Sequence, residues 1–151
     1  MLIRARLIAP ACRLVVSACC LVVLAGCSSK DPVQALLDDV IEATEDRDAH
    51  ALADLLTDDV SAGGMDKNAL AGTLRQYLAA YQALDVSFSD IESVRRGGSA
   101  QVKLNARMTG VPQSIGGLGD LVPQNAKYHF DLTLRETPEG WKISQVDWQE
   151  L

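Results

Sequence analysis

The chain has few cysteines, and three of its four lie within the first 20 residues. The fourth, Cys27, is the last cysteine in the sequence. If the segment before Cys27 is removed, the rest of the chain has no second thiol, so it forms no internal disulfide and offers no multi-thiolate metal site. We therefore expect the remaining domain to be stabilised by its apolar core alone.

Basic residues are also scarce beyond that segment. The segment carries Arg4, Arg6 and Arg13, three of the 14 Lys and Arg side chains, and none of the 20 acidic ones. The remaining 11 basic and 20 acidic side chains give residues 27–151 a net charge of −9. Nucleic-acid binding relies on Lys and Arg against phosphates, so this balance argues against a nucleic-acid partner. The simplest role of the excess negative charge is solubility.

The N-terminal segment has the pattern of a secretory signal peptide. Its arginines precede an uncharged apolar run at 14–24, and small residues follow it. This order of a positive start, an apolar middle and a small-residue end is typical of a cleaved signal. The run is shorter than the roughly 20 apolar residues that span a bilayer, and an uncleaved anchor helix is the alternative.

The end of this segment, Leu24-Ala25-Gly26-Cys27, resembles the lipobox of bacterial lipoproteins at every position. The resemblance implies cleavage before Cys27, a diacylglycerol on its thiol, and acylation of the new amino group, for example with palmitate. Ser28 in place of an aspartate favours the outer membrane in the enterobacterial sorting rule. We therefore predict a lipid anchor to the periplasmic face of the outer membrane.

The sequence accordingly divides into three parts: a signal peptide (1–26), the lipidated cysteine with a short tether (27–30), and a single α+β domain (31–151). Three extended residues of tether reach only about 10 Å. Asp31 followed by Pro32 is typical of a helix start, so we expect a domain that stays close to its membrane.

Apolar residues recur at helical spacing in three stretches, from Pro32, from about Ala49, and from Lys67 to Tyr81. A short strand at 60–62 lies between the second and third helices. The apolar period then changes to two in four segments, which start near residues 86, 102, 128 and 141. In the last segment Trp141 and Ile143 differ in parity from Val146 and Trp148, and a bulge near 144–145 would bring all four to one face. Helices followed by such a meander predict an α+β fold, with the N-terminal helices packed on a curved four-stranded antiparallel sheet.

This order of elements resembles the nuclear-transport-factor-2-like (NTF2-like, cystatin-like) superfamily, in which a curved sheet wraps a long helix. The ending Gly140-Trp141-Lys142-Ile143 is similar to the last strand common in that group. The resemblance implies a cone-shaped domain with a pocket between sheet and helices. It does not imply a reaction, because the superfamily contains enzymes, binding proteins and assembly modules.

The charged and other strongly polar residues singled out on the second and third long strands share the parity opposite to the core. They are Lys103, Asn105, Arg107, His129, Asp131 and Arg135. Because only the apolar parity can face the helices, we expect these side chains to point away from any pocket. His129 with Asp131 has the form of a general base and its orienter, but we interpret both as solvated side chains.

Four residues can face the interior of the cone: Tyr77, Tyr81, Met108 and Tyr128. A tyrosine hydroxyl there could donate to a ligand oxygen, and the alternative is core packing with a satisfied hydroxyl. The connection at 110–125 is long for a hairpin and rich in glycine and proline. Its apolar residues, among them Ile115, Leu118 and Leu121, suggest a lid, a partner-contact patch, or a loop folded onto its own domain.

These observations favour a non-catalytic envelope lipoprotein. We expect it to bind an apolar small ligand or a protein partner at the mouth of the cone and to use no cofactor or metal. The alternative is a small isomerase or hydro-lyase of the same fold. An interior carboxylate or histidine would favour the enzyme, and an interior of apolar side chains would favour binding.

Overall fold

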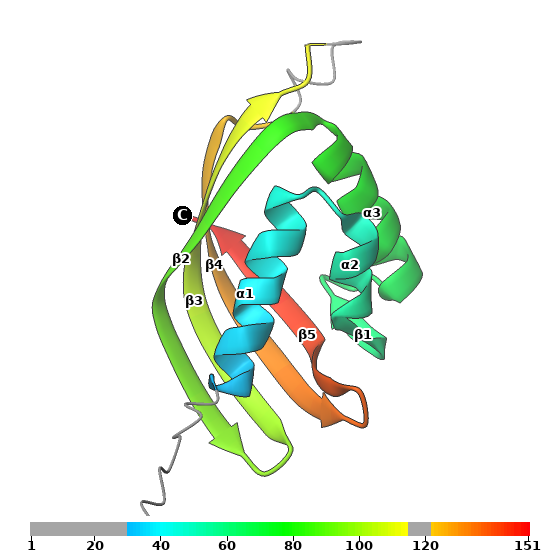
Figure 1. Ribbon diagram of the computed structural model, residues 1–151, viewed down its shortest axis with the longest axis vertical. Coiled ribbons are helices and arrows are strands. Elements are labelled where there is room, and N and C mark those ends of the chain that lie inside the picture. The colour runs from blue at the N-terminus through cyan, green and yellow to red at the C-terminus, as the bar shows by residue number, and fades with distance from the viewer. Residues whose placement is uncertain (1–29, 115–121) are drawn as a thin grey trace, which may run out of the picture.

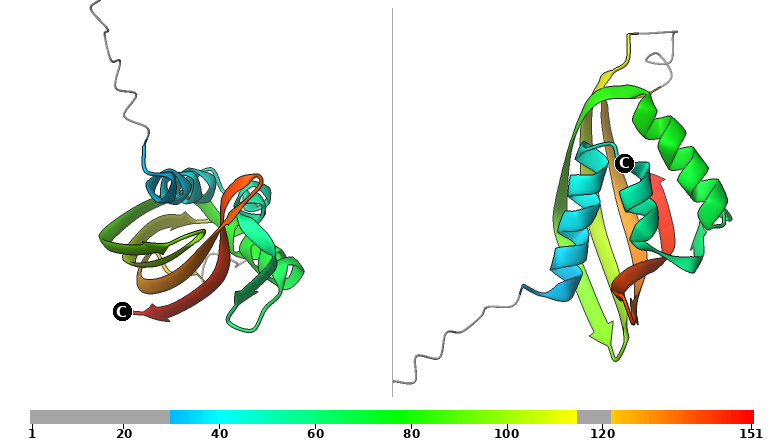
Figure 2. Two further views of the ribbon diagram at one scale, coloured as in Figure 1. Left: turned by 90° about the horizontal axis from the view of Figure 1, so that it is seen from below. Right: turned by 45° about the vertical axis from the view of Figure 1, so that its right-hand side comes forward.

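The computed structural model describes residues 30–114 and 122–151, in which three helices lie against the concave face of a curved sheet (Figure 1). In chain order the elements are α1 (Pro32–Glu45), α2 (Ala49–Asp54), β1 (Leu56–Ala62), α3 (Lys67–Ala79), β2 (Tyr81–Arg96), β3 (Ser99–Pro112), β4 (Asn125–Thr137) and β5 (Gly140–Glu150). The α+β class predicted from the sequence is confirmed. The views in Figure 2 show the sheet wrapping around one side of the helices.

The sheet has five strands in the order β1-β5-β4-β3-β2. Strands β2 to β5 form the expected antiparallel meander, whereas β1 adds to the β5 edge in parallel, pairing Leu56 with Ile143 and Ala62 with Val146. The prediction of a four-stranded antiparallel sheet was therefore wrong. The exposed pair Asp58-Asp59 interrupts the apolar alternation of β1, and a parallel partner far along the chain leaves no hairpin signal in the sequence.

The helices begin where their capping residues predict. The Asp31 carboxylate accepts from the Val33 amide at 2.8 Å, and Asp48 and Asp66 cap the starts of α2 and α3 in the same way. The predicted end of the third helix at Tyr81 was wrong, because α3 stops at Ala79 and Tyr81 opens β2. The carbonyl of Tyr81 instead accepts from the Arg47 guanidinium at 3.0 Å.

Bulges shape the long strands. Asp90 has a φ of 52° where the β2–β3 register shifts, and Ser144 is the extra residue of β5 opposite the Thr133–Leu134 step. The predicted bulge near 144–145 is thus confirmed. It brings both apolar parities of β5 to the inner face, since Ile143, Val146 and Trp148 all line one interior cavity.

The core lies between α1 and the inner face of the sheet. Val102, Leu104 and Leu134 are at most 1% exposed and pack with Leu37 of α1. Burying one such side chain contributes roughly 1.5–3 kcal/mol, so this face supplies much of the stability of the domain. Within the described ranges, no helix is both long and apolar enough to cross a membrane.

Candidate functional site

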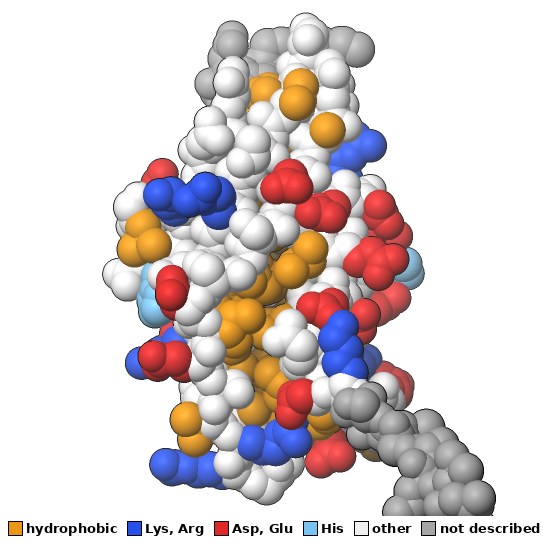
Figure 3. Space-filling model, turned by 60° about the vertical axis from the view of Figure 1, so that its left-hand side comes forward, with side chains coloured by type: hydrophobic (Ala, Val, Ile, Leu, Met, Phe, Trp, Pro, Cys, Tyr) orange, Lys and Arg blue, Asp and Glu red, His pale blue; other side chains and the backbone are white. Residues whose placement is uncertain are grey.

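Beyond the packed core, the inner face of the sheet opens into a cavity of about 310 Å³. This volume is at the lower end of the range of small-ligand sites, roughly 300–1,000 Å³. Figure 3 shows hydrophobic side chains gathered in a hollow on this side of the molecule, with acidic side chains along part of its border. The cavity lies where the sequence-based resemblance implied a pocket.

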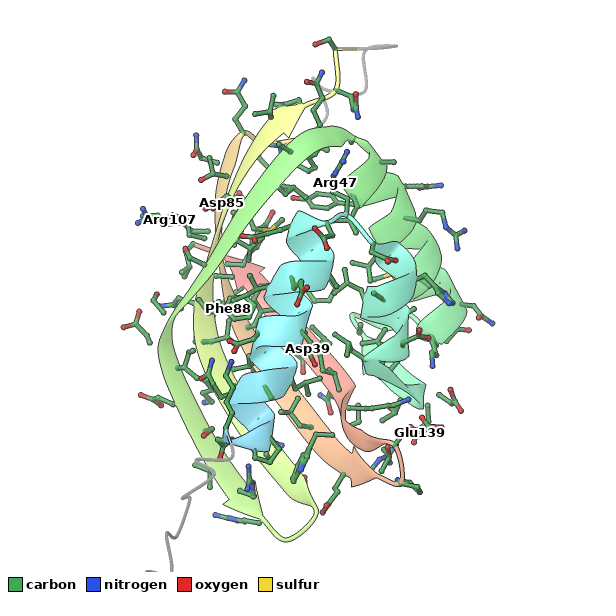
Figure 4. All side chains as sticks on the ribbon, in the orientation of Figure 1. Asp39, Arg47, Asp85, Phe88, Arg107 and Glu139 are labelled. Carbon is green, nitrogen blue, oxygen red and sulfur yellow. The ribbon has the colours of Figure 1, made fainter. Side chains whose placement is uncertain are left out.

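The cavity wall is almost wholly apolar. Helix α3 contributes Leu70, Leu74 and Tyr77, and the sheet contributes among others Phe88, Met108 and Trp148. In Figure 4, Phe88 points from β2 toward α1, whereas Asp85 and Arg107 point away from the helices. The side chains with a polar group among the described lining residues are Thr44, Thr73, Tyr77, Tyr128 and Trp148, which carries an indole N–H.

The two threonines have their hydroxyl protons engaged within their own helices. Thr44 donates to the Val40 carbonyl at 2.7 Å, and Thr73 donates to the Ala69 carbonyl at 3.0 Å. Such back-bonding is common for hydroxyl side chains inside helices. The tyrosine hydroxyls and the indole N–H of Trp148 are therefore the polar groups of the lining that bear on ligand recognition.

All three tyrosines of the chain meet at one end of the cavity. The Tyr81 hydroxyl donates to the Pro123 carbonyl at 2.8 Å, and its oxygen lies 3.1 Å from that of Tyr77. Tyr128 lines the same cavity as Tyr77. The rings of Tyr77 and Tyr81 also pack edge to face, with their centroids 5.4 Å apart.

Tyr81 is 1% exposed and sits behind the lining rather than in it. Gly110 of β3 makes room for its ring, since a Cβ there would lie 2.4 Å from two ring carbons. The side-chain amide of Gln113 donates to the Tyr81 carbonyl at 3.1 Å, alongside Arg47. Tyr81 is thus held firmly and serves as a fixed support for the hydroxyl of Tyr77.

Burial makes these phenols harder to ionise than free tyrosine. It raises the pKa of Tyr128 to about 12, with the nearby Tyr77 hydroxyl adding to the effect. Burial likewise raises the pKa values of Tyr77 and Tyr81. At neutral pH the cluster therefore offers uncharged hydroxyls, each with one proton to donate.

Glu150 of β5 is a carboxylate residue that pairs with Tyr128 in the sheet. It lies directly opposite Tyr128 in the β4–β5 register, so both side chains emerge from the same face. Burial is the main cause of the raised pKa values of Tyr77 and Tyr128, and the negative charge of Glu150 raises both further. Glu150 is not among the pocket residues predicted from the sequence, although the alternation of β5 reaches it two positions past Trp148.

The outward-facing polar residues stand where the strand parity placed them, and they pair across strands. His129 Nδ1 is 2.8 Å from Asn105 Oδ1, and Lys103 is 3.8 Å from Asp131. His129 and Asp131 therefore have separate partners rather than each other. The described residues contain no group of three or more His, Cys, Asp or Glu arranged to hold a metal ion.

Only some of the residues that the sequence predicts for the pocket line the cavity. Tyr77, Met108 and Tyr128 line the cavity, and Tyr81 supports it from behind. Ile115, Leu118 and Leu121, proposed for a lid or contact patch, lie outside the described residues, as does Cys27. The connection itself is shorter than expected from 110–125, because β3 extends to Pro112 and the Gly110 amide donates to the Gln124 carbonyl.

Neither a family model nor a curated protein matches this sequence. Solved structures do match its fold. An NTF2-like protein from Cytophaga hutchinsonii is 15% identical, with a TM-score of 0.64 over 79% of this chain and 95% of that one. The fold is NTF2-like. At this identity the likeness shows the fold alone.

Two further neighbours of the same fold carry names that suggest enzymes. A protein from Streptomyces avermitilis, provisionally named as a dehydratase of the NTF2-like family, is 16% identical, with a TM-score of 0.67 over 80% of this chain and 94% of that one. A protein from Novosphingobium aromaticivorans, provisionally named as a scytalone dehydratase, is 12% identical, with a TM-score of 0.66 over 80% and 82%.

Proposed function

We propose that this protein is an envelope lipoprotein, anchored through lipid on Cys27, that binds an apolar small ligand without catalysing a reaction. The observation that carries the proposal is the chemistry of the cavity. Its described lining has apolar side chains, four hydroxyls and one indole N–H, but no carboxylate, imidazole or ammonium group. Each ligand CH₂ buried there contributes about 0.8 kcal/mol, so an apolar body gains affinity and a charged one loses hydration.

The N-terminal sequence supports the anchor. The lipobox-like Leu24-Ala25-Gly26-Cys27 stands five residues before Pro32, where the first helix begins. Helix α1 has 14 residues and is therefore about 21 Å long at 1.5 Å per residue. Arg47, just past its C-terminal end, contacts Tyr81, so the tyrosine end of the cavity lies a helix length from the anchored end.

A small isomerase or hydro-lyase is the second candidate. The provisionally named dehydratases among its structural neighbours favour it, and Glu150 beside Tyr128 is the residue that could act as its base. A general base must reach the substrate from within the site, but Glu150 is exposed and is not part of the lining. We therefore rank binding first.

Blocking the cavity tests the proposal. Thr73 lines the cavity from an exposed position on α3, so Thr73→Trp should fill part of it at little cost in stability. Gln76→Trp places the same side chain on an exposed position of the same helix outside the lining. We expect native mass spectrometry of protein purified from membranes to show an apolar molecule bound to the wild type and to Gln76→Trp, and reduced in Thr73→Trp.

The absence of any bound molecule, together with no uptake of added apolar compounds, would contradict ligand binding. A separate measurement addresses the anchor. Intact-mass analysis should show acyl mass on the wild-type protein, and Cys27→Ser should lose both that mass and cleavage of the segment before it. An unmodified Cys27 in membrane-extracted protein would overturn the anchor but leave the cavity proposal standing.

A further inference from the structure

Ala106 of β3 is a small residue surrounded by four larger side chains on the inner face of the sheet. Across the strands it pairs with Phe88 of β2 and with Tyr128 of β4. Along β3 it lies between Leu104 and Met108, two positions away on either side. Such neighbours share one face of a sheet, and all five residues line the cavity. Ala106 is therefore the floor of an aromatic slot whose two walls are Phe88 and Tyr128.

The adjacent rows of the sheet have a different composition. In one of them Met108 lies between Val86 and Ala126. In the other, Leu104 pairs with Phe130 of β4. Among the described strands, Ala106 is the one position that has an aromatic residue directly opposite it on both neighbouring strands.

Contacts outside the slot hold both of its walls. The Val86 amide, two residues before Phe88, donates to the Glu45 carboxylate of α1 at 2.9 Å and so fixes this part of the β2 edge to the helix. The Tyr128 ring packs against that of Phe130, with centroids 6.0 Å apart. Phe88 points from β2 toward α1 (Figure 4) and has no ring partner within the described residues.

The spacing of the two walls suits a flat ring. Neighbouring strands lie about 4.8 Å apart. Because strand side chains stand roughly perpendicular to the sheet, rings on β2 and β4 are about 10 Å apart. A ring halfway between them has its centre about 5 Å from each wall, within the distances of favourable aromatic pairs. A saturated ring is thicker and has no π-system, and an alkyl chain gains no ring–ring contact.

We infer that the cavity binds an uncharged ligand with a flat aromatic ring, which stands on Ala106 with its faces toward Phe88 and Tyr128. This inference rests on the proposed binding function and names its ligand class. Aliphatic side chains of α1 and α3, among them Val40 and Leu74, form the opposite wall of the cavity. The ligand carries no charge in this space, because the described lining has no charged group to pair with one.

Three ten-carbon alcohols separate ring shape from apolar burial: β-naphthol, its fully saturated decahydro derivative, and decanol. Each carries one hydroxyl, which the Tyr128 hydroxyl can donate to or accept from. Binding is measured by isothermal titration calorimetry on the chain purified from membranes and held in lipid nanodiscs, with empty nanodiscs as the blank. Although β-naphthol is the least apolar of the three, we expect it to bind about tenfold tighter than the others, as for two aromatic pairs.

One pair of matched variants tests the slot. Phe88→Leu removes one wall and keeps an apolar side chain, whereas Phe130→Leu makes the same change one row away, opposite Leu104. We expect Phe88→Leu to reduce the preference for β-naphthol about threefold or more, and Phe130→Leu to leave most of it. Ala106→Leu raises the floor and should weaken β-naphthol more than decanol, because a flexible chain can shift along the cavity and a rigid ring cannot.

The outcomes distinguish the ligand class from binding itself. Equal or tighter binding of the saturated alcohols would overturn the aromatic ligand and leave apolar binding intact, whereas no binding of any probe would overturn both. An equal loss of preference in Phe88→Leu and Phe130→Leu, or no loss in either, would overturn the slot as the place of the ring. Thermal unfolding checks the fold of each variant, and if Ala106→Leu does not fold, the two phenylalanine variants still decide.

Discussion

The two faces of β3 and β4 have opposite roles, although their residues alternate along the same strands. On the inner face Val102 and Leu104 are at most 1% exposed and pack against α1. On the outer face Lys103 and Asp131 form a 3.8 Å pair in contact with solvent. The packed core and the cavity therefore both lie on the inner face, whereas the outer face keeps its charges in water.

The inner face is itself uneven. Near the β2–β3 turn it is closely packed, with Ala100, Val102 and Leu134 almost completely buried. Toward the other end of β3, Ala106 and Met108 border the cavity, and Gly110 leaves space for Tyr81. One end of the sheet therefore closes the core and the other end keeps a space open.

The largest effect should come from the packed end. Leu134 is 0% exposed, so Leu134→Ala should lower the free energy of unfolding by about 2–5 kcal/mol through lost burial and a new void. The neighbouring Arg135→Ala removes an outward-facing side chain that pairs with Asp59 and should cost below about 1 kcal/mol. Urea denaturation measures both, and similar costs would contradict the division between faces.

The second-largest effect on stability should come from filling the space beside the Tyr81 ring at the open end of the sheet. Gly110→Ala places a methyl group against the Tyr81 ring, and we expect it to cost about 1–3 kcal/mol as overpacking does elsewhere. Gly72→Ala is the matched control, because it lies in α3 with open space around its Cβ position. It should instead stabilise the protein by up to about 1 kcal/mol, through the higher helix propensity of alanine.

The sequence was sufficient to predict that helices pack on a sheet and which residues of the long strands face the core. Period-two alternation placed His129 and Asp131 on the outer face, and Asp31 placed the start of the first helix, because both signals are local. The parallel pairing of β1 with β5 was missed, since it joins segments separated by some 80 residues and depends on tertiary packing. For the same reason α3 was extended to Tyr81, whose apolar ring fits a helical stripe as well as a strand.

The candidate site was predictable in part. Tyr77 was proposed from the apolar stripe of its helix and Tyr128 from the apolar parity of its strand, and both line the cavity. The hydrogen bonding of Tyr77 was not predictable, because its partner Tyr81 is held by Pro123 and Gly110, which are distant from it in sequence. Glu150 was overlooked because a charged residue near a strand end has the pattern of a solvated side chain.

High pH should lower the free energy of unfolding of the domain through its three buried tyrosines. Burial raises the pKa of Tyr128 to about 12 and raises the pKa values of Tyr77 and Tyr81. In the unfolded chain these phenols ionise near pH 10, so their contribution to stability is complete below pH 10 and is lost as pH rises toward 12. Because the chain has only these three tyrosines, tyrosinate absorbance should rise together with unfolding, and a rise near pH 10 in folded protein would contradict their burial.

The smallest effect should come from the outer face. Lys103 and Asp131 are 3.8 Å apart, and their side chains are 56% and 43% exposed. Solvent screens such a pair, so a double-mutant cycle with Lys103→Ala and Asp131→Ala should give a coupling energy of about 0–1 kcal/mol that decreases further in salt. A coupling well above 1 kcal/mol would mean that the outer face is covered in the native protein. The two faces would then differ in what they pack against rather than in whether they are packed.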